Sequence, residues 1–348
     1  MVTNSNKQNN LINILKGICI IFIITTHVTW SETARNNLVF PYIIDMAVPI
    51  FMIISGYVYT LSFRRQNISC LSAAYSPANI VNKILRYTIP FTIAYLIELI
   101  YYTATTPTKL TINSCMEWVF CFFQGGIGPG SYYYPILIQF IFLFPVLYFI
   151  VKKNNRKGLI ICFAINAIYE FLQRAYGMDA NLYRLLIFRY IFVISAGCYM
   201  ASESPKPNPK IGFLLSLIGI TFIATTTYWG YSPKIIIYWT NTSLIACLYI
   251  IPIIFLLITK VQNIHFVPLE IIGKASYNIF LTQLAWYTVG SWYVEKFIDN
   301  TFVLWGINLL VCISAGLLFY FIETPITKRI IKKLYATLNL NSNHTHRS

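Results

Sequence analysis

The stretch that decides the fold is NILKGICIIFIITTHVTW, which runs from Asn13 to Trp30. It is almost wholly apolar and close to the ~20 residues that a membrane span requires. It nevertheless carries two ionisable side chains, Lys16 and His27. Their spacing is almost three helical turns, so both fall on one helix face, about 16 Å apart along the axis. Two interpretations stay open: a face that lines a polar interior, or a snorkelling Lys16 and a His27 bonded to a neighbouring helix.

The composition of the whole chain indicates a membrane protein. Of its 348 residues 57% are hydrophobic and only 11% are charged, with a mean hydropathy of +0.62. A soluble protein of this size needs far more charge on its surface. The net charge of +15 does not indicate nucleic-acid binding, because the basic residues cluster between apolar runs, as the positive-inside rule expects. The Cys residues are scattered without a CxxC pair, so we expect neither a disulfide framework nor a metal site.

The apolar runs predict an all-α polytopic membrane protein with about ten transmembrane helices. The predicted spans are 11–30, 40–63, 84–104, 131–151, 158–174, 184–202, 211–229, 235–259, 271–294 and 301–322. The run 115–126 is too short to cross and is interpreted as an interfacial or re-entrant segment. The spans form a single transmembrane domain at 11–330, with a tail at 1–10 and a second at 331–348 that we expect to be disordered.

The distribution of basic residues orients these spans. Six of the 26 Lys and Arg residues fall on the outer side and Arg189 falls inside a span, which leaves nineteen (26 − 6 − 1) on the inner side. The outer six are Arg35, Lys109, Arg174, Arg184, Lys234 and Lys296. The positive-inside rule therefore predicts that both termini are cytoplasmic, in a multi-pass protein of the plasma membrane.

Further charged residues lie at or within the predicted spans. Asp45 opens the second span at the level of His27, where a carboxylate would orient the imidazole; the alternative is an ordinary helix-start residue. Lys83 and Arg86 share a helix face, either as positive-inside anchors or as a pair that binds phosphates from the cytoplasm. Glu98 and Arg189 lie inside predicted spans and require partners.

Several motifs, in order over about 15 to 330, resemble the integral-membrane acyltransferase family 3, which includes glycan O-acetyltransferases. That family has a basic residue, ten spacers and a His in its first span, which here stands as Lys16-x10-His27. The other similar stretches are VPIFMIISGY (48–57), KILRYTIP (83–90), SYYYPILIQFIFLFPVL (131–147), IGKASYNIFLTQLAWY (272–287) and FIETPITKRI (321–330).

This sequence departs from the family pattern at three positions. Lys16 stands where the family usually has Arg, which keeps the charge and loses the planar fork. Tyr132, with no Glu nearby, stands where many relatives have Trp followed by Glu, and Gln283 stands where a His is common. These differences concern the acceptor and the acyl group more than the class of reaction.

The resemblance implies a membrane-embedded acyltransferase that moves an acyl group, by default acetyl, from cytoplasmic acyl-CoA to a hydroxyl of a glycan or lipid-linked sugar at the outer face. His27 would act as general base with Asp45 orienting it. The expected partners are membrane lipid, acyl-CoA as co-substrate and the saccharide, with no resident cofactor, metal or nucleic acid. The donor-binding residues would be Lys16, Lys83, Arg86 and Glu323; the acceptor or oxyanion candidates are Tyr132, Tyr133, Tyr134, Glu170 and Arg184.

Two other classes of function stay open. A transporter or flippase for a polysaccharide precursor would also have many spans and buried charges, although such transporters often show broken helices or an internal repeat. A non-enzymatic membrane partner of a glycan-synthesis complex would tolerate the loss of His27. Release of free thiol from acetyl-CoA distinguishes the enzyme from both.

Overall fold

The computed structural model is helical throughout the residues that it describes, which are 2–105, 112–202, 208–231, 233, 236, 238–261 and 264–337. No strand occurs within these ranges. The chain forms two compact units, which we describe separately. Unit 1 comprises Met1–Cys70 and Phe144–Lys274, and unit 2 comprises Leu71–Leu143 and Ala275–Ser348.

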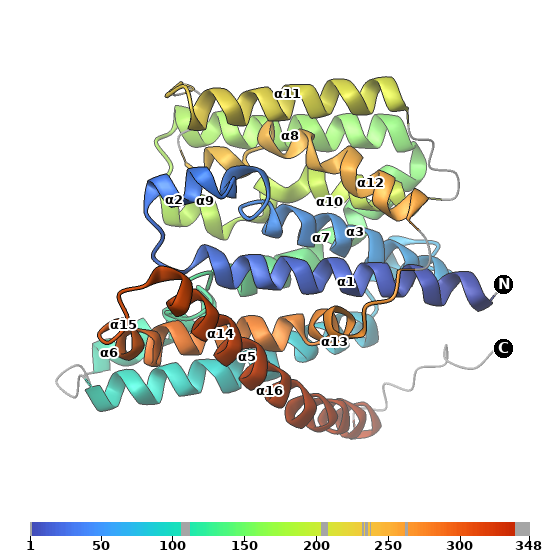
Figure 1. The fold of residues 1–348 in the computed structure, drawn as a ribbon. Coiled ribbons are helices and arrows are strands. Elements are labelled where there is room, and N and C mark those ends of the chain that lie inside the picture. Colours follow the sequence, from blue (N-terminus) through green and yellow to red (C-terminus); the bar gives the residue numbers. More distant parts are fainter. Residues whose placement is uncertain are drawn as a thin grey trace. The chain divides into compact units, whose positions relative to one another are not determined.

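Unit 1 contains most of the helices (Figure 1). They are α1 (Val2–Thr26), α2 (Glu32–Asn37), η1 (Phe40–Tyr42), α3 (Ala47–Arg65), the second half of α7 (Tyr133–Lys153), α8 (Asn155–Ala175), α9 (Ala180–Leu185), η3 (Ile187–Tyr190), α10 (Ile191–Met200), α11 (Pro209–Thr227), η4 (Thr240–Thr242), η5 (Ala246–Leu248), α12 (Ile250–Lys260) and α13 (Val267–Lys274).

Close approach of helices in unit 1 depends on glycines. A Cβ built on Gly56 of α3 would lie 2.1 Å from the Ile194 carbonyl oxygen of α10, and one on Gly197 of α10 would lie 2.0 Å from the Ile53 carbonyl oxygen. Gly17 of α1 meets α13 in the same way, at the Leu269 carbonyl oxygen. Small residues at such crossings are typical of membrane helices. Accordingly α1, α3 and α10 lie side by side in Figure 1.

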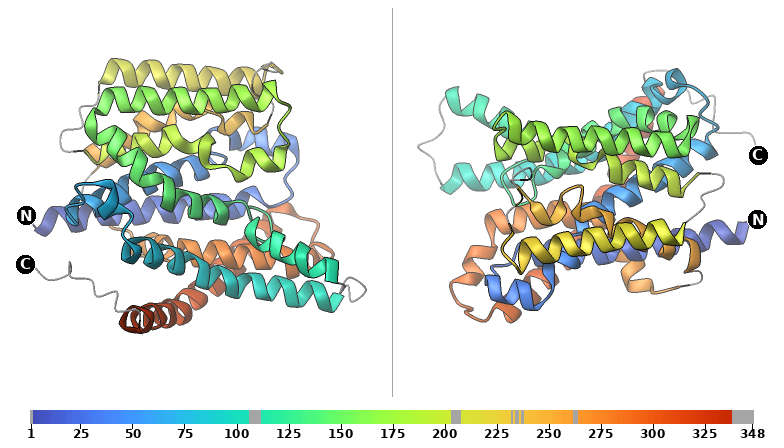
Figure 2. Two further views of the ribbon diagram at one scale, coloured as in Figure 1. Left: turned by 180° about the vertical axis from the view of Figure 1, so that it is seen from behind. Right: turned by 90° about the horizontal axis from the view of Figure 1, so that it is seen from above.

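Unit 2 is built on three long helices and several short ones. It contains α4 (Leu71–Ala74), α5 (Pro77–Thr105), α6 (Ile112–Phe123), the first half of α7, α14 (Ser276–Val289), α15 (Ser291–Glu295) and α16 (Thr301–Thr337). Helix α14 packs against both α5 and α16, and Figure 2 shows α5 beside α14.

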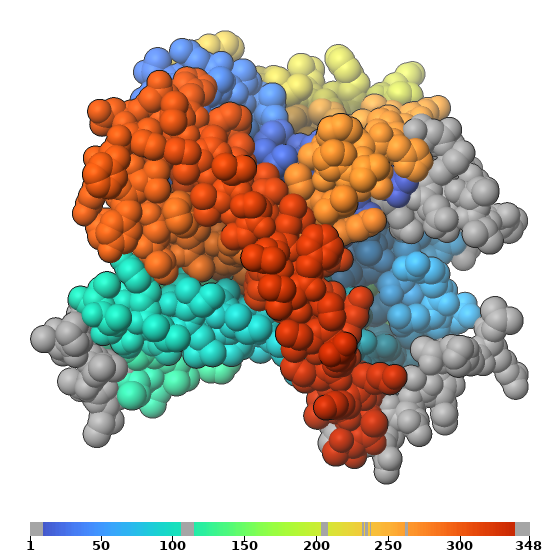
Figure 3. Space-filling view, turned by 60° about the horizontal axis from the view of Figure 1, so that its bottom comes forward, coloured from blue at the N-terminus to red at the C-terminus, as the bar shows by residue number. Residues whose placement is uncertain are grey.

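Helix α16 has one buried stripe and a broad exposed surface. The stripe follows helical spacing through Leu304, Asn308, Cys312 and Gly316, because residues four apart share a helix face. Its other face carries exposed apolar side chains such as Leu310, which is 70% exposed, and the helix stands out as a ridge in Figure 3. A large exposed apolar surface suits contact with lipid.

The expected all-helical membrane fold is confirmed, whereas about ten spans and two cytoplasmic termini stay predictions. Six helices within the described residues are long and apolar enough to cross a membrane, or seven if the bent pair Thr240–Leu248 and Ile250–Lys260 is one span. Asn10–Thr26 and Ile187–Met200 are shorter apolar helices. The predicted span 271–294 is interrupted at Ala275, between α13 and α14.

Helix also reaches into both predicted tails. Helix α1 already begins at Val2, and α16 continues to Thr337. The remainder of the expected C-terminal tail, 338–348, lies outside the described residues.

Candidate functional site

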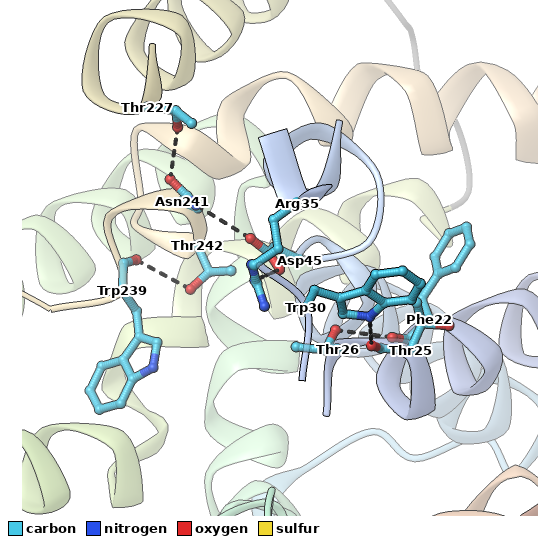
Figure 4. A network of polar contacts seen from close by, with 10 residues as sticks. All are labelled: Phe22, Thr25, Thr26, Trp30, Arg35, Asp45, Thr227, Trp239, Asn241 and Thr242. Carbon is cyan, nitrogen blue, oxygen red and sulfur yellow. Dashed lines mark hydrogen bonds and ion pairs between the residues drawn. The ribbon is translucent and has the colours of Figure 1, made fainter. Parts of the chain in front are cut away.

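His27 lies in the turn directly beyond α1. Thr25 and Thr26 donate hydroxyl hydrogen bonds back to the carbonyls of Ile21 and Phe22, at 2.8 and 3.0 Å. The Trp30 indole donates to the Thr25 carbonyl at 2.9 Å, as Figure 4 shows. The Trp30 bond satisfies one of the carbonyls that a helix end otherwise leaves unpaired, and the two threonine bonds add a second donor to carbonyls within the helix. The helix therefore ends in a defined turn, with the imidazole half-buried within it.

An ion pair lies close to this turn. Arg35 Nη2 donates to Asp45 Oδ1 at 3.0 Å, and the Asn241 amide donates to Asp45 Oδ2 at 3.3 Å. Asn241 in turn accepts from the Thr227 hydroxyl at 3.4 Å (Figure 4). The Asp45 side chain is only 10% exposed, so the network holds a carboxylate and a guanidinium in fixed positions. A paired and hydrogen-bonded buried carboxylate avoids most of its desolvation cost.

The Arg35 guanidinium is near enough to affect His27. A positive charge close to an imidazole disfavours the imidazolium ion. The Arg35 guanidinium therefore favours the neutral ring, which is able to accept a proton.

Asp45 is bonded to Arg35 and Asn241, and its role in orienting His27 stays a prediction. The sequence interpretation counted Arg35 only as an outer-side charge. The signal that it missed is the short helix α2, whose N-cap Ser31 accepts from the Ala34 N–H and which carries Arg35 in its last turn.

Lys16 lies on the same helix as the turn that holds His27. It is half-buried in α1, directly before the close contact of Gly17 with Leu269. The helix is continuous from Lys16 to Thr26, as the spacing argument required.

Polar residues of unit 1 gather in a second cluster around Arg189. Its guanidinium donates to the Thr242 hydroxyl at 2.7 Å and lies over the rings of Tyr183 and Trp239, at 5.1 and 5.4 Å. Glu170 accepts from the Leu244 N–H at 2.7 Å. These contacts are the partners that Arg189 requires inside its predicted span. Arg184, at the end of α9, is half-buried.

In unit 2, Lys83 and Arg86 both lie on α5, with Lys83 half-buried and Arg86 exposed. Glu323 of α16 accepts from the Asn278 amide at 2.9 Å and from the Thr327 hydroxyl. Its hydrogen-bond partners are thus neutral groups of its own unit.

The three consecutive tyrosines at the start of α7, of which Tyr132 directly precedes the helix, differ in their surroundings. The Tyr134 hydroxyl shares a hydrogen bond of 3.0 Å with Thr88, and its ring stacks on Phe91 with 3.7 Å between centroids. Tyr133 meets Phe280 edge-on at 5.2 Å. Tyr132 is half-buried.

Glu98 holds the glycine-rich loop that precedes α7. Its carboxylate accepts from the N–H groups of Ile127 and Gly128, at 3.0 and 3.2 Å, and from the Thr288 hydroxyl at 3.1 Å. Gly126 adopts a φ of 97°, which favours glycine. The buried carboxylate therefore has a structural explanation, because the loop supplies the donors that it needs.

Comparison with known proteins identifies the family. A family model described as an acyltransferase domain matches residues 9–334. No curated protein and no solved structure matches the chain. The match covers nearly the entire sequence and agrees with the motifs around Lys16 and His27, so the chain belongs to the integral-membrane acyltransferase family 3.

Proposed function

We propose that this acyltransferase moves an acyl group, by default acetyl, from cytoplasmic acyl-CoA to a hydroxyl of a glycan or lipid-linked sugar at the outer face of the plasma membrane. The observation that carries the proposal is the setting of His27. It combines a half-buried imidazole in the turn that follows α1 and the nearby Arg35–Asp45 pair with a cation, Lys16, almost three turns earlier on α1.

The proposed reaction is a direct transfer. The neutral imidazole of His27 accepts the proton of the acceptor hydroxyl, and the hydroxyl oxygen attacks the thioester carbon. The carbon–sulfur bond breaks, the sulfur leaves as a thiolate, and the imidazolium returns its proton to that sulfur. The products are the O-ester and CoA with a free thiol, and His27 is neutral again.

Arg35 and Asp45 have positioning roles in this scheme. Arg35 keeps His27 uncharged before the acceptor binds, and Asp45 fixes the guanidinium. An imidazole kept neutral by a neighbouring cation is a weaker base, but it stays available as a proton acceptor over a wide pH range. The bound substrates also exclude water from the imidazole, which further disfavours its charged form.

The other proposed roles follow the sequence motifs. Lys16 is proposed to bind the donor, because a cation is suited to its phosphates; Lys83, Arg86 and Glu323, which belong to unit 2, stay predicted donor-binding residues. The oxyanion of the tetrahedral intermediate requires hydrogen-bond donors, which stay predictions from the sequence. The candidates for the oxyanion and the acceptor are Tyr132, Tyr133, Tyr134, Glu170 and Arg184.

The experiment is thiol release from acetyl-CoA by the purified protein in lipid nanodiscs, with a saccharide acceptor, comparing the wild type with His27→Gln. General-base catalysis contributes about 10²- to 10⁴-fold, so we expect the rate to fall by at least 100-fold. The matched control is His265→Gln, because the His265 side chain is 58% exposed; it should retain the wild-type rate.

Each outcome has a distinct meaning. Wild-type turnover in His27→Gln contradicts the role of His27. A wild-type protein that translocates a lipid-linked sugar in vesicles and releases no thiol is a transporter, and the proposed reaction is then wrong.

A further inference from the structure

Unit 1 presents an exposed tryptophan on a strained backbone. Trp239 has a φ of 49° and a ψ of 49°, in the left-handed region that a bulky residue rarely adopts. The residue is nonetheless 42% exposed, so burial of the indole does not explain this conformation. Such outliers persist only where the surrounding structure fixes them, and they cluster at active sites and ligand-binding sites.

Buried groups hold the indole from one side. Tyr183 stacks on the indole with 6.0 Å between the ring centroids, and the Arg189 guanidinium lies 5.4 Å from the indole centroid. Tyr183 and Arg189 are only 2% and 4% exposed. The guanidinium lies 5.1 Å from the centre of the Tyr183 ring, so both groups approach the indole from a common direction. The exposed part of the indole is therefore a rigid aromatic surface.

A buried amide lies on α8, which packs on the same tyrosine. Gln173 is 2% exposed, and its side-chain nitrogen has no hydrogen-bond partner among the described residues. It shares a face of α8 with Tyr169 and Glu170, and Tyr169 stacks on Tyr183. Buried polar groups are usually hydrogen-bonded, so this amide is available to a hydroxyl of a ligand.

Helix η4 connects the indole to the ion pair near His27. Trp239 directly precedes η4, and Asn241 within it donates to Asp45 at 3.3 Å. The indole and Asp45 lie on different sides of η4, and the indole points away from the carboxylate (Figure 4). A group bound to Trp239 is therefore separate from the group that reacts at His27.

An aromatic belt at the membrane interface is the alternative explanation, since Trp is enriched there. Trp229, which follows α11 and is 76% exposed, fits that description. Trp239 differs in its contacts with the buried Tyr183 and Arg189 and in its left-handed backbone. A belt requires neither feature, because contact with lipid headgroups needs only an exposed ring.

We propose that Trp239 binds a sugar ring of the acceptor next to the ring that receives the acyl group, so that the acceptor is a saccharide of at least two rings. A sugar ring has a face of C–H groups, which packs on the negative face of an aromatic ring. Its hydroxyl groups require polar partners, for which the Gln173 amide is the candidate.

This proposal rests on the proposed function and deepens it, because it names the size of the acceptor and a residue that selects it. Glu170, which is already a candidate for contact with the acceptor, lies on the same face of α8 as Gln173.

The test uses polysaccharide from the envelope of the native cells, cleaved and separated by size into monosaccharides and oligosaccharides. Thiol release from acetyl-CoA by the protein in nanodiscs gives kcat and KM for each fraction. The wild type should have the lower KM for the oligosaccharides. Trp239→Ala should raise that KM by about tenfold, the order expected for the loss of one aromatic contact, with little change in kcat. A retained kcat excludes general damage to the fold.

Two further variants make the result specific. Trp229→Ala removes an exposed tryptophan from the same predicted outer side and should leave the KM of the oligosaccharides unchanged. Trp239→Phe keeps an aromatic ring and should restore most of the affinity that Trp239→Ala loses. An equal KM in the wild type and Trp239→Ala overturns the proposal. An equal rise of KM in Trp229→Ala also overturns it and indicates an interfacial belt.

Failure of this proposal and failure of the proposed function give different results. If thiol release and its dependence on His27 persist while the KM is insensitive to Trp239→Ala, the function stands and the sugar-binding role of Trp239 is wrong. If calorimetry shows that the oligosaccharides bind and that Trp239→Ala weakens their binding, but no thiol is ever released, the role of Trp239 stands and the acyl transfer is wrong.

Discussion

At the scale of single residues, the protonation of His27 depends on a charge that is distant in the sequence. Removing the Arg35 charge with Arg35→Gln should make His27 easier to protonate, because the guanidinium repels a second positive charge on the imidazole. The proposed active form is the neutral imidazole, so the rate falls at the pH where the ring becomes protonated. The acid limb of kcat/KM should therefore move to higher pH in the variant, as measured by thiol release between pH 4.5 and 8.

Arg174→Gln is a suitable control for this shift. Arg174 is exposed at the end of α8, and its replacement removes the same charge far from the ion pair in sequence. It should leave the acid limb in place. An unchanged limb in Arg35→Gln would show that this charge does not control the base, whatever the rate at pH 7.

The residues of the candidate site were predictable from sequence to different extents. Lys16 lies on α1 and His27 in the turn directly beyond it, so helix geometry accounts for most of their separation along the axis. The pairing of Arg35 with Asp45 depends instead on a six-residue helix and a turn, which hydrophobic periodicity does not detect. The partners of Glu98 come from a loop some thirty residues away and from Thr288, and no local pattern connects them.

At the scale of elements, the contact between α3 and α10 leaves no room for side chains. A Cβ at Gly56 would overlap the Ile194 carbonyl, which is backbone and cannot rotate away. Gly56→Ala should therefore lower the free energy of unfolding by about 1–3 kcal/mol, the usual cost of overpacking. The loss of the folded fraction during a urea titration in mild detergent measures this change in the free energy of unfolding.

A second glycine separates this packing effect from the effect of alanine itself. Gly306 lies on the exposed face of α16, with no atom within 4 Å of a Cβ built there. Gly306→Ala should be neutral or slightly stabilising, because alanine favours helix over glycine by about 1 kcal/mol. If Gly56→Ala behaves like Gly306→Ala, α3 and α10 do not approach as closely as the structure shows.

At the scale of the whole molecule, composition alone was sufficient for the class of fold and the ordered motifs for the family. The number of spans was less predictable. The apolar run around Leu186 contains a 3-10 turn, η3, before α10 begins at Ile191, and the run that ends in α12 is bent by 56°. Mean hydropathy over a window is insensitive to such breaks, because they need a change of backbone and not of polarity.

The orientation of the molecule is the prediction on which the direction of acyl transfer depends, and a native cysteine can report it. Cys70, in the segment after α3, is exposed, and the positive-inside rule places it in the cytoplasm. Glu32, exposed at the start of α2, is predicted outside, where Glu32→Cys would introduce a second reporter. A membrane-impermeant maleimide applied to intact cells should label Glu32→Cys and leave Cys70 unlabelled until the membrane is opened.

Cys115→Ser removes the other fully exposed thiol of the described residues and serves as the common background. Labelling of Cys70 from outside would reverse the predicted topology, and the proposed direction of acyl transfer would then be wrong.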